Sequence, residues 1–236
     1  MEPLAVTFDI YGTLFNIDTD EESDDVFRKF SHWLYLNEVK IDPDSLKRAY
    51  KQEFVKREAL MLANGVDRPE VDVRDVLTSI FGAKGRRRFV EEACLVFRSL
   101  TTKRISLRNG VDSSLKSIGK PLALISNAQS AFTWPELRAF GIDQLFSAVV
   151  LSSEVRSKKP SPIPFRVALA ELGMNGRESG IIHVGDTYET DVVGAKKAGM
   201  KAILITKERR EFEVKPDAFL DPDKFSELPD VIRSIR

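Results

Sequence analysis

The sequence predicts an α/β protein, in which a doubly wound parallel sheet is interrupted after its first strand by a helical insertion. Short apolar runs alternate with amphipathic helices from about residue 108 onward, a pattern typical of parallel sheets covered on both faces. One further apolar run, residues 4–8, precedes a long stretch with helical periodicity. The 236 residues exceed one average domain and fall short of two, which suits a core domain carrying an insertion.

The segment from residue 16 to residue 103 shows helical patterns throughout and few candidate strands. Its first helix follows Thr19 and Glu22, which have capping-box spacing. Its second helix begins at Asp42-Pro43, with proline at the first helical position. Two more helices carry apolar stripes further along the segment. We therefore expect residues 16–103 to be a helical insertion.

The rest of the chain alternates between strands and helices. Buried strands are predicted at residues 121–125, 146–151, 181–184 and 202–205. Three helices lie between or after these strands, and each ends at a glycine. The first of them has capping-box spacing at Thr133 and Glu136, just where its apolar pattern begins. Residues 1–15 and 104–236 are thus predicted to form a Rossmann-like parallel sheet core.

Composition excludes several classes of protein. The 36 basic and 36 acidic side chains cancel, so no overall field draws the chain to nucleic acid or to an anionic membrane. The start of the chain lacks a targeting pattern, and no run of about 18 apolar residues occurs, so we expect a cytoplasmic protein. The single cysteine, Cys94, excludes an internal disulfide framework.

The most informative feature is an aspartate directly after the first predicted strand. Asp9 follows the apolar run of residues 4–8 and precedes a tight turn at Gly12. Open α/β sheets bind their ligands at the carboxyl ends of their strands. Asp9 is therefore the candidate nucleophile.

Three other polar spots follow predicted strands. Ser126-Asn127 precedes a helix, a position suited to holding an anion. Lys159 places a positive charge before Pro160. The stretch from Gly185-Asp186 to Asp191 holds two carboxylates five positions apart. An acidic residue is favourable in the first turn of a helix, which explains Asp191 at the start of the predicted helix. The same reason does not apply to Asp186.

The order and spacing of these motifs make the chain similar to the haloacid dehalogenase superfamily of aspartate-nucleophile hydrolases. The hexapeptide DIYGTL at residues 9–14 resembles the family's first motif, Ser126 its second and Lys159-Pro160 its third. The fourth motif corresponds to residues 185–191. The likeness spans nearly the whole chain, and the helical insertion at residues 16–103 resembles the family's cap domain.

The resemblance implies a Mg²⁺ site and an aspartyl-phosphate mechanism. A phosphate dianion about 4 Å from one carboxylate is repelled by about 8 kcal/mol at an effective dielectric near 20, so the pocket needs cations. The residues expected to hold the ion, directly or through water, are Asp9, the Tyr11 carbonyl, Asp186 and Asp191. The residues expected to bind phosphate are Gly12, Thr13, Ser126, Asn127 and Lys159. The expected catalytic residues are Asp9, Tyr11, Ser126 and Lys159.

Tyr11 departs from the pattern of the family's phosphatases, most of which carry an acid two positions after the nucleophile. Such an acid protonates the leaving group, which is worth about 10²- to 10⁴-fold in rate. Alcohol leaving groups should therefore depart slowly, whereas aryl or acyl phosphates should suffer less. A tyrosine here is similar to the dehalogenase branch, in which Asp9 would attack carbon and displace halide.

We favour a Mg²⁺-dependent phosphohydrolase acting on a small phosphorylated metabolite, because Asp186 would be a liability in a metal-free site that accepts a carboxylate. A 2-haloacid dehalogenase is the alternative. A binding protein whose chemistry has decayed is a further alternative, since fold does not fix function. The sequence predicts no nucleic-acid or membrane partner, and it leaves the oligomeric state and the substrate open.

Overall fold

The computed structural model describes residues 2–208 and 210–235, and its main feature is a parallel sheet. Six strands of the described chain form this sheet in the order β5-β4-β1-β6-β7-β8, and all the neighbouring pairs run parallel. The strands are β1 (Ala5–Phe8), β4 (Leu122–Ser126), β5 (Ala148–Leu151), β6 (Ile181–Gly185), β7 (Lys201–Ile205) and β8 (Ala218–Leu220). The predicted α/β fold class with a Rossmann-like sheet is confirmed.

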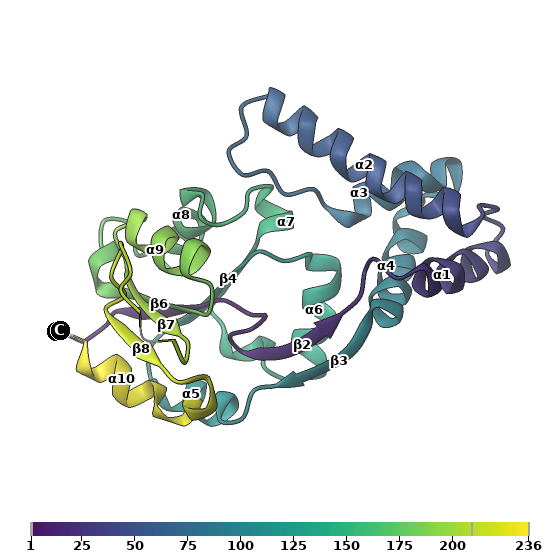
Figure 1. Cartoon of the computed structure of the whole chain (residues 1–236). Helices are drawn as coiled ribbons and strands as arrows, with labels where there is room; N and C mark the ends of the chain where they lie inside the picture. Colours follow the sequence, from purple (N-terminus) through teal and green to yellow (C-terminus); the bar gives the residue numbers. More distant parts are fainter. Residues whose placement is uncertain (1, 209, 236) are drawn as a thin grey trace.

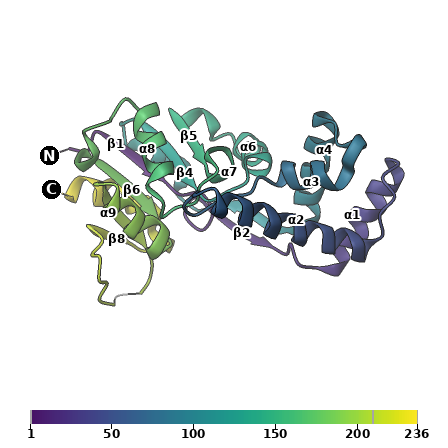
Figure 2. The same ribbon diagram turned by 90° about the horizontal axis from the view of Figure 1, so that it is seen from above.

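Helices cover both faces of the sheet. Alternate strand residues point to opposite sides, so each face presents apolar side chains that pack against helices. Val6 and Phe8 of β1 belong to the core on one face, together with residues of α5, α6 and α10. Ala5 belongs to the core on the other face, with residues of α8 and α9. The helices are α5 (Val111–Ser117), α6 (Ser130–Ala139), α7 (Ser152–Val155), α8 (Pro162–Glu171), α9 (Val193–Lys197) and α10 (Leu228–Ser234). Figures 1 and 2 show them around the strands.

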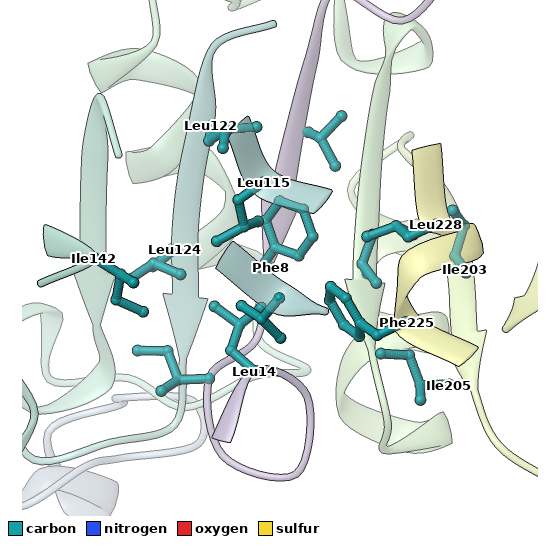
Figure 3. Close-up of a cluster of buried hydrophobic side chains, with 14 of the residues drawn as sticks. Phe8, Leu14, Leu115, Leu122, Leu124, Ile142, Ile203, Ile205, Phe225 and Leu228 are labelled. Carbon is teal, nitrogen blue, oxygen red and sulfur yellow. The ribbon is translucent and has the colours of Figure 1, made fainter. Parts of the chain in front are cut away.

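The first of these cores fixes the strand that carries the candidate nucleophile. Figure 3 shows Phe8 with Leu115 of α5 and Leu124 of β4 on its left, and with Phe225 and Leu228 on its right. Phe8 and Phe225 are both fully buried. Burial of an aromatic side chain stabilises a fold by about 2–3 kcal/mol. This packing holds the carboxyl end of β1 in place.

The helical insertion forms a second compact unit beside the sheet (Figure 1). Its helices are α1 (Asp24–Leu36), α2 (Pro43–Ala63), α3 (Val73–Phe81) and α4 (Arg87–Thr101). They share a hydrophobic cluster in which Phe97 contacts the rings of Phe27, Phe30 and Tyr50 at centroid distances of 5.8, 5.2 and 5.1 Å. Cys94 is buried in the same cluster.

Two antiparallel strands connect the insertion to the sheet. β2 (Phe15–Thr19) pairs with β3 (Thr102–Leu107), and neither strand was expected from the sequence. Both contain several polar residues and are only partly buried, so they lack the continuous apolar run that indicates a buried strand. The domain limits predicted at residues 15/16 and 103/104 fall inside β2 and β3, so the exact division stays a prediction.

The start of α6 also differs from the expectation. The helix begins at Ser130, so Thr133 and Glu136 lie within it and do not form a capping box. Their side chains instead approach Tyr11. Among the described residues, we find no helix whose length and apolarity would let it cross a membrane.

The aromatic cluster of the insertion makes a stability prediction. Phe97→Ala removes a fully buried ring with several aromatic neighbours, so it should lower the free energy of unfolding by about 3–5 kcal/mol. Amide hydrogen exchange should accelerate most in α1, α2 and α4, as measured by mass spectrometry.

Leu95→Ala is the matched control, because Leu95 lies on the same helix with 46% of its surface exposed. This variant should stay within about 0.5 kcal/mol of the parent. Equal losses in the two variants would show that the cluster does not stabilise the insertion.

Candidate active site

Asp9 lies at the carboxyl end of the central strand β1. Its backbone N–H donates to the Val184 carbonyl of β6 at 2.9 Å, which continues the pairing of β1 with β6 by one residue. β4 lies on the other side of β1 and ends at Ser126. The topology therefore places Asp9 between the ends of two neighbouring strands, and only 8% of the residue is exposed.

Lys159 occupies the centre of the site. Its ammonium group contacts Asp9 Oδ1 at 2.8 Å and Asp191 Oδ1 at 2.6 Å, and it donates to the Ile125 carbonyl at 2.6 Å. Burial alone would lower the pKa of Lys159, but the charges of Asp191 and Asp9 raise it above its usual range. Lys159 is therefore a buried cation that is held between two carboxylates.

Asn127 positions the lysine segment. Its amide oxygen accepts from the Lys159 backbone N–H at 2.7 Å, and its amide nitrogen donates to the Lys159 carbonyl at 3.0 Å. This pair joins the end of β4 to the loop between α7 and α8. Lys159 therefore reaches the site from a loop that follows α7, rather than directly from β5. A phosphate-binding role for Asn127 stays a prediction.

Asp191 is held from several sides. Its Oδ2 accepts from the Thr187 backbone N–H at 2.9 Å, and its Oδ1 lies 3.5 Å from His183 Nε2. Burial alone would raise the pKa of Asp191, but Lys159 and His183 bring it below its usual range. The carboxylate packs against Gly185, where a Cβ would lie 2.3 Å from the Asp191 carboxyl carbon. Gly185 therefore leaves the room that Asp191 needs.

Asp186 is held by the first motif. Thr13 Oγ1 donates to Asp186 Oδ1 at 2.9 Å. Gly12 has a φ of +85°, and a Cβ at this position would lie 2.3 Å from Asp186 Oδ2. Gly12 and Thr13 therefore position the Asp186 carboxylate. Their contact with phosphate stays a prediction.

The donor set fits a divalent cation. Ligand oxygens of Asp9, Asp186 and Asp191 lie within 4.8 Å of one another, and carboxylate oxygens are the ligands that Mg²⁺ prefers. Burial, and then the charges of Asp9 and Asp191, raises the pKa of Asp186 to about 6. Burial also raises the pKa of Asp9, against the opposing charge of Lys159. One ammonium group among three carboxylates leaves negative charge that a cation would balance.

Tyr11 is turned toward α6. Its hydroxyl donates to Glu136 Oε2 at 2.5 Å and lies 3.0 Å from Thr133 Oγ1. Arg98 Nε donates to Glu136 Oε1 at 2.6 Å, and the Arg98 guanidinium lies 5.4 Å from the Tyr11 ring centroid. Burial raises the pKa of Tyr11 far above its usual range, with Glu136 adding to the effect. The hydroxyl therefore stays protonated and engaged.

The chain is similar to proteins of a known family. Residues 71–205 match the sequence profile described as haloacid dehalogenase-like hydrolase, which is more than half of the chain. The chain belongs to the haloacid dehalogenase-like hydrolases. The match covers Ser126, Lys159, Asp186 and Asp191, and the predicted family resemblance is confirmed.

Among curated proteins, this chain is similar to phosphatases. It is 39% identical over 99 residues to the glyceraldehyde 3-phosphate phosphatase of Methanothermobacter thermautotrophicus, covering 42% of this chain and 43% of that protein. It is 35% identical over 94 residues to the phosphoglycolate phosphatase of Yersinia pestis, covering 40% of this chain and 39% of that protein. The chain spans about half the length, or less, of the curated relatives that it matches.

Solved structures share the fold of this chain along its length. A 2-haloacid dehalogenase from Pseudomonas syringae pv. Tomato aligns with a TM-score of 0.71 and 21% identity, covering 99% of both chains. A phosphatase of the family from Thermococcus onnurineus aligns with a TM-score of 0.60 and 21% identity, covering 98% of both chains. At this identity the likeness concerns the fold alone.

Some residues of the site escaped the sequence analysis. His183 is fully buried and lies between Asp191 and Thr7, whose hydroxyl oxygen lies 2.8 Å from His183 Nδ1. Arg98 and Glu136 meet Tyr11 from separate helices. The sequence offered no signal for Arg98. Glu136 is a carboxylate near the start of a predicted helix, and it could have been considered as a partner for Tyr11.

The shifted pKa of Asp186 predicts how a substitution changes stability. A carboxyl group whose pKa rises on folding, here from 3.8 to about 6, lowers stability as pH increases through that interval. Asp186→Asn should therefore raise the free energy of unfolding of the metal-free protein by about 1–3 kcal/mol at pH 7.5, and by little below pH 4. Urea unfolding in the presence of a chelator measures this.

The same variant should lose the stabilisation that added Mg²⁺ gives the parent, because a ligand of the ion is gone. Asp230→Asn, at an exposed position of α10, is the control and should change neither quantity. A metal-free Asp186→Asn protein that is less stable than the parent at pH 7.5 would contradict this account of the acidic cluster.

Proposed function

We propose that this chain is a Mg²⁺-dependent phosphohydrolase that acts on a small phosphorylated metabolite through an aspartyl-phosphate. The observation that carries the proposal is the pairing of Asp9 with Lys159 at 2.8 Å, beside carboxylates of Asp186 and Asp191 within 4.8 Å. The curated relatives named above are phosphatases, which supports the same chemistry. Bound Mg²⁺ would supply positive charge that neutralises the acidic cluster and attracts a phosphoryl group.

Asp9 is the nucleophile in this proposal. A carboxylate oxygen of Asp9 attacks phosphorus, the bond from phosphorus to the leaving-group oxygen breaks, and an aspartyl-phosphate forms. Water then attacks that phosphorus, which releases inorganic phosphate and regenerates Asp9. The Oδ1 atom of Asp9 is bound to Lys159, which leaves the Oδ2 atom as the attacking oxygen.

Lys159 and Ser126 complete the anion site. The Lys159 ammonium group balances part of the negative charge of the transferring phosphoryl group, and Asp191 holds that ammonium group in place. Ser126 ends β4 beside Asp9, and its hydrogen bond favours the ionised form of the Asp9 carboxyl group. Asn127 would act mainly by fixing the Lys159 segment, with its phosphate contact secondary.

Tyr11 limits the range of leaving groups. Its hydroxyl group already donates to Glu136 and has a high pKa, so it is a poor proton donor at neutral pH. Poor leaving groups such as alkoxides need a proton, whereas aryl and acyl phosphates do not. The proposed enzyme therefore favours phosphate esters and anhydrides whose leaving groups are already stable as anions.

Tyr11 also favours the alternative function, a 2-haloacid dehalogenase in which Asp9 attacks carbon. The charged Asp186 carboxylate argues against it, because that reaction has to bring a carboxylate substrate beside three acidic side chains. Halide release from a 2-haloacid, measured beside phosphate release from an aryl phosphate, separates the two functions. Activity in neither assay would favour a binding protein.

Asp9→Asn should abolish turnover, lowering kcat on an aryl phosphate by about 10⁴-fold or more, because an amide is a very weak nucleophile. Asparagine is nearly isosteric, so folding should be retained. Phosphate release with Mg²⁺ present measures the first effect, and urea unfolding measures the second. A folded variant with full activity would remove the proposed nucleophile.

Tyr11→Asp should raise kcat on alkyl phosphates by about tenfold to a hundredfold, and by less on aryl phosphates, because it supplies the missing acid. Parallel measurements with glycerol phosphate and phenyl phosphate give the comparison.

Tyr11→Phe is the matched control, since it removes the contact with Glu136 without adding an acid. It should change the rates on both ester classes alike. If Tyr11→Asp behaves as Tyr11→Phe does, leaving-group protonation is not the bottleneck.

A further inference from the structure

A pocket of about 300 Å³ opens between the sheet core and the insertion, next to the proposed phosphoryl site. On the core side it is lined by Tyr11, two positions after the proposed nucleophile, and by Asn127, directly after Ser126. The ionisable lining residues on the other side are Glu21, Glu70 and Arg98. A phosphoryl group at Asp9 would therefore direct its leaving group into this pocket, whose charges then decide which leaving groups are accepted.

The positive charge of Arg98 is already compensated. Its Nε donates to Glu136 at 2.6 Å, and its Nη1 lies 3.9 Å from Glu21 Oε1. The guanidinium also packs on two rings, 5.4 Å from the Tyr11 centroid and 5.2 Å from the Phe132 centroid. Only 12% of the side chain is exposed. Arg98 is therefore committed to its present partners and is not free to receive a carboxylate from a substrate.

Glu70, by contrast, accepts hydrogen bonds only from uncharged groups within the part of the chain that the structure describes. Ser152 Oγ donates to Glu70 Oε2 at 2.7 Å, and Gln129 Nε2 donates to Glu70 Oε1 at 3.2 Å. The orientation of the Gln129 amide is fixed, because its oxygen accepts from the Val73 N–H and its nitrogen donates to the Val71 carbonyl. Both Glu70 oxygens are thus acceptors, as an ionised carboxylate requires.

The charge of Glu70 is therefore left largely uncompensated. Lys158 acts on Glu70 through its charge, but its ammonium group pairs with Glu58 at 3.4 Å. Among the described residues, the charged groups that line the pocket are the carboxylates of Glu21 and Glu70 and the guanidinium of Arg98. The charge of this guanidinium is also balanced by Glu136. The pocket is net negative and offers an acceptor. An anionic substituent brought here would be repelled, whereas a donor would find a hydrogen-bond partner.

We propose that this pocket selects phosphorylated molecules whose leaving group carries no anionic substituent and donates a hydrogen bond, from a hydroxyl or an ammonium group, to Glu70. The inference rests on the proposed function and deepens it by naming the class of substrate. Under this proposal Arg98 is structural, and Glu70 is the residue that determines specificity.

The test uses three aryl phosphates of similar size, with Mg²⁺ present at about pH 7.5. They are 4-(hydroxymethyl)phenyl phosphate, 4-(aminomethyl)phenyl phosphate and 4-carboxyphenyl phosphate. The value of kcat/KM for the carboxyl compound should be about tenfold lower, or more, than for either of the others. An equal or higher value for the carboxyl compound would overturn the inference.

Two variants locate the effect. Glu70→Gln removes the charge and should shrink the preference for the hydroxymethyl over the carboxyl compound by about threefold or more, mainly through KM. Glu21→Gln, at the other pocket carboxylate, should shrink it in the same direction. Glu92→Gln is the matched control, since it removes an exposed carboxylate that pairs with Arg88 outside the lining of the pocket. An unchanged preference in Glu70→Gln would overturn the assignment to Glu70, whatever Glu21→Gln does.

The outcomes separate this inference from the proposed function. Hydrolysis of all three compounds with no preference leaves the phosphohydrolase in place and removes the inference alone. Hydrolysis of none of the three removes the proposed function, and the inference falls with it. A preference for the aminomethyl over the hydroxymethyl compound identifies an ammonium group as the donor, and the reverse order identifies a hydroxyl group.

Discussion

The structure of the site depends on one buried ammonium group that lies between two carboxylates. Lys159 contacts Asp9 and Asp191 at 2.8 and 2.6 Å, and its side chain is 1% exposed. Removing one partner from such a buried group leaves an unpaired charge, which costs about 3–5 kcal/mol. The pairing is therefore costly to break, and it still leaves excess negative charge because Asp186 is close by. That excess is the physical reason to expect a divalent cation.

The topology of the sheet and a few close contacts bring the charged residues of the site together. Parallel strands end at the same edge of the sheet, so Asp9, Ser126 and Asp186 converge although they are far apart in sequence. Close approach then requires residues without a Cβ, at Gly12 beside Asp186 and at Gly185 beside Asp191. Asn127 ties the Lys159 loop to the end of β4. Each of these residues thus contributes to the packing of the charged cluster.

The sequence predicted the sheet core because buried parallel strands are near-continuous apolar runs. It also predicted that one site contains Asp9, Lys159, Asp186 and Asp191, because motifs that follow parallel strands converge at one edge of the sheet. It could not predict β2 and β3, because these partly exposed strands mix polar and apolar residues and carry no such signal. It also misjudged Thr133 and Glu136, since the same spacing serves a helix cap or a partner for Tyr11. Contacts between a helix of the insertion and one of the core, such as Arg98 with Glu136, depend on tertiary packing that local patterns do not contain.

The most direct test of the central claim is a crystal structure of the protein grown with Mg²⁺ and beryllium fluoride, which mimics a phosphoryl group on an aspartate. The account predicts a trifluoroberyllate bonded to a carboxylate oxygen of Asp9, a Mg²⁺ ion between Asp9 and Asp186, and the Lys159 ammonium group still within hydrogen-bond distance of Asp191. A structure in which the Asp9 carboxylate is unmodified and no ion lies between Asp9 and Asp186 would contradict it.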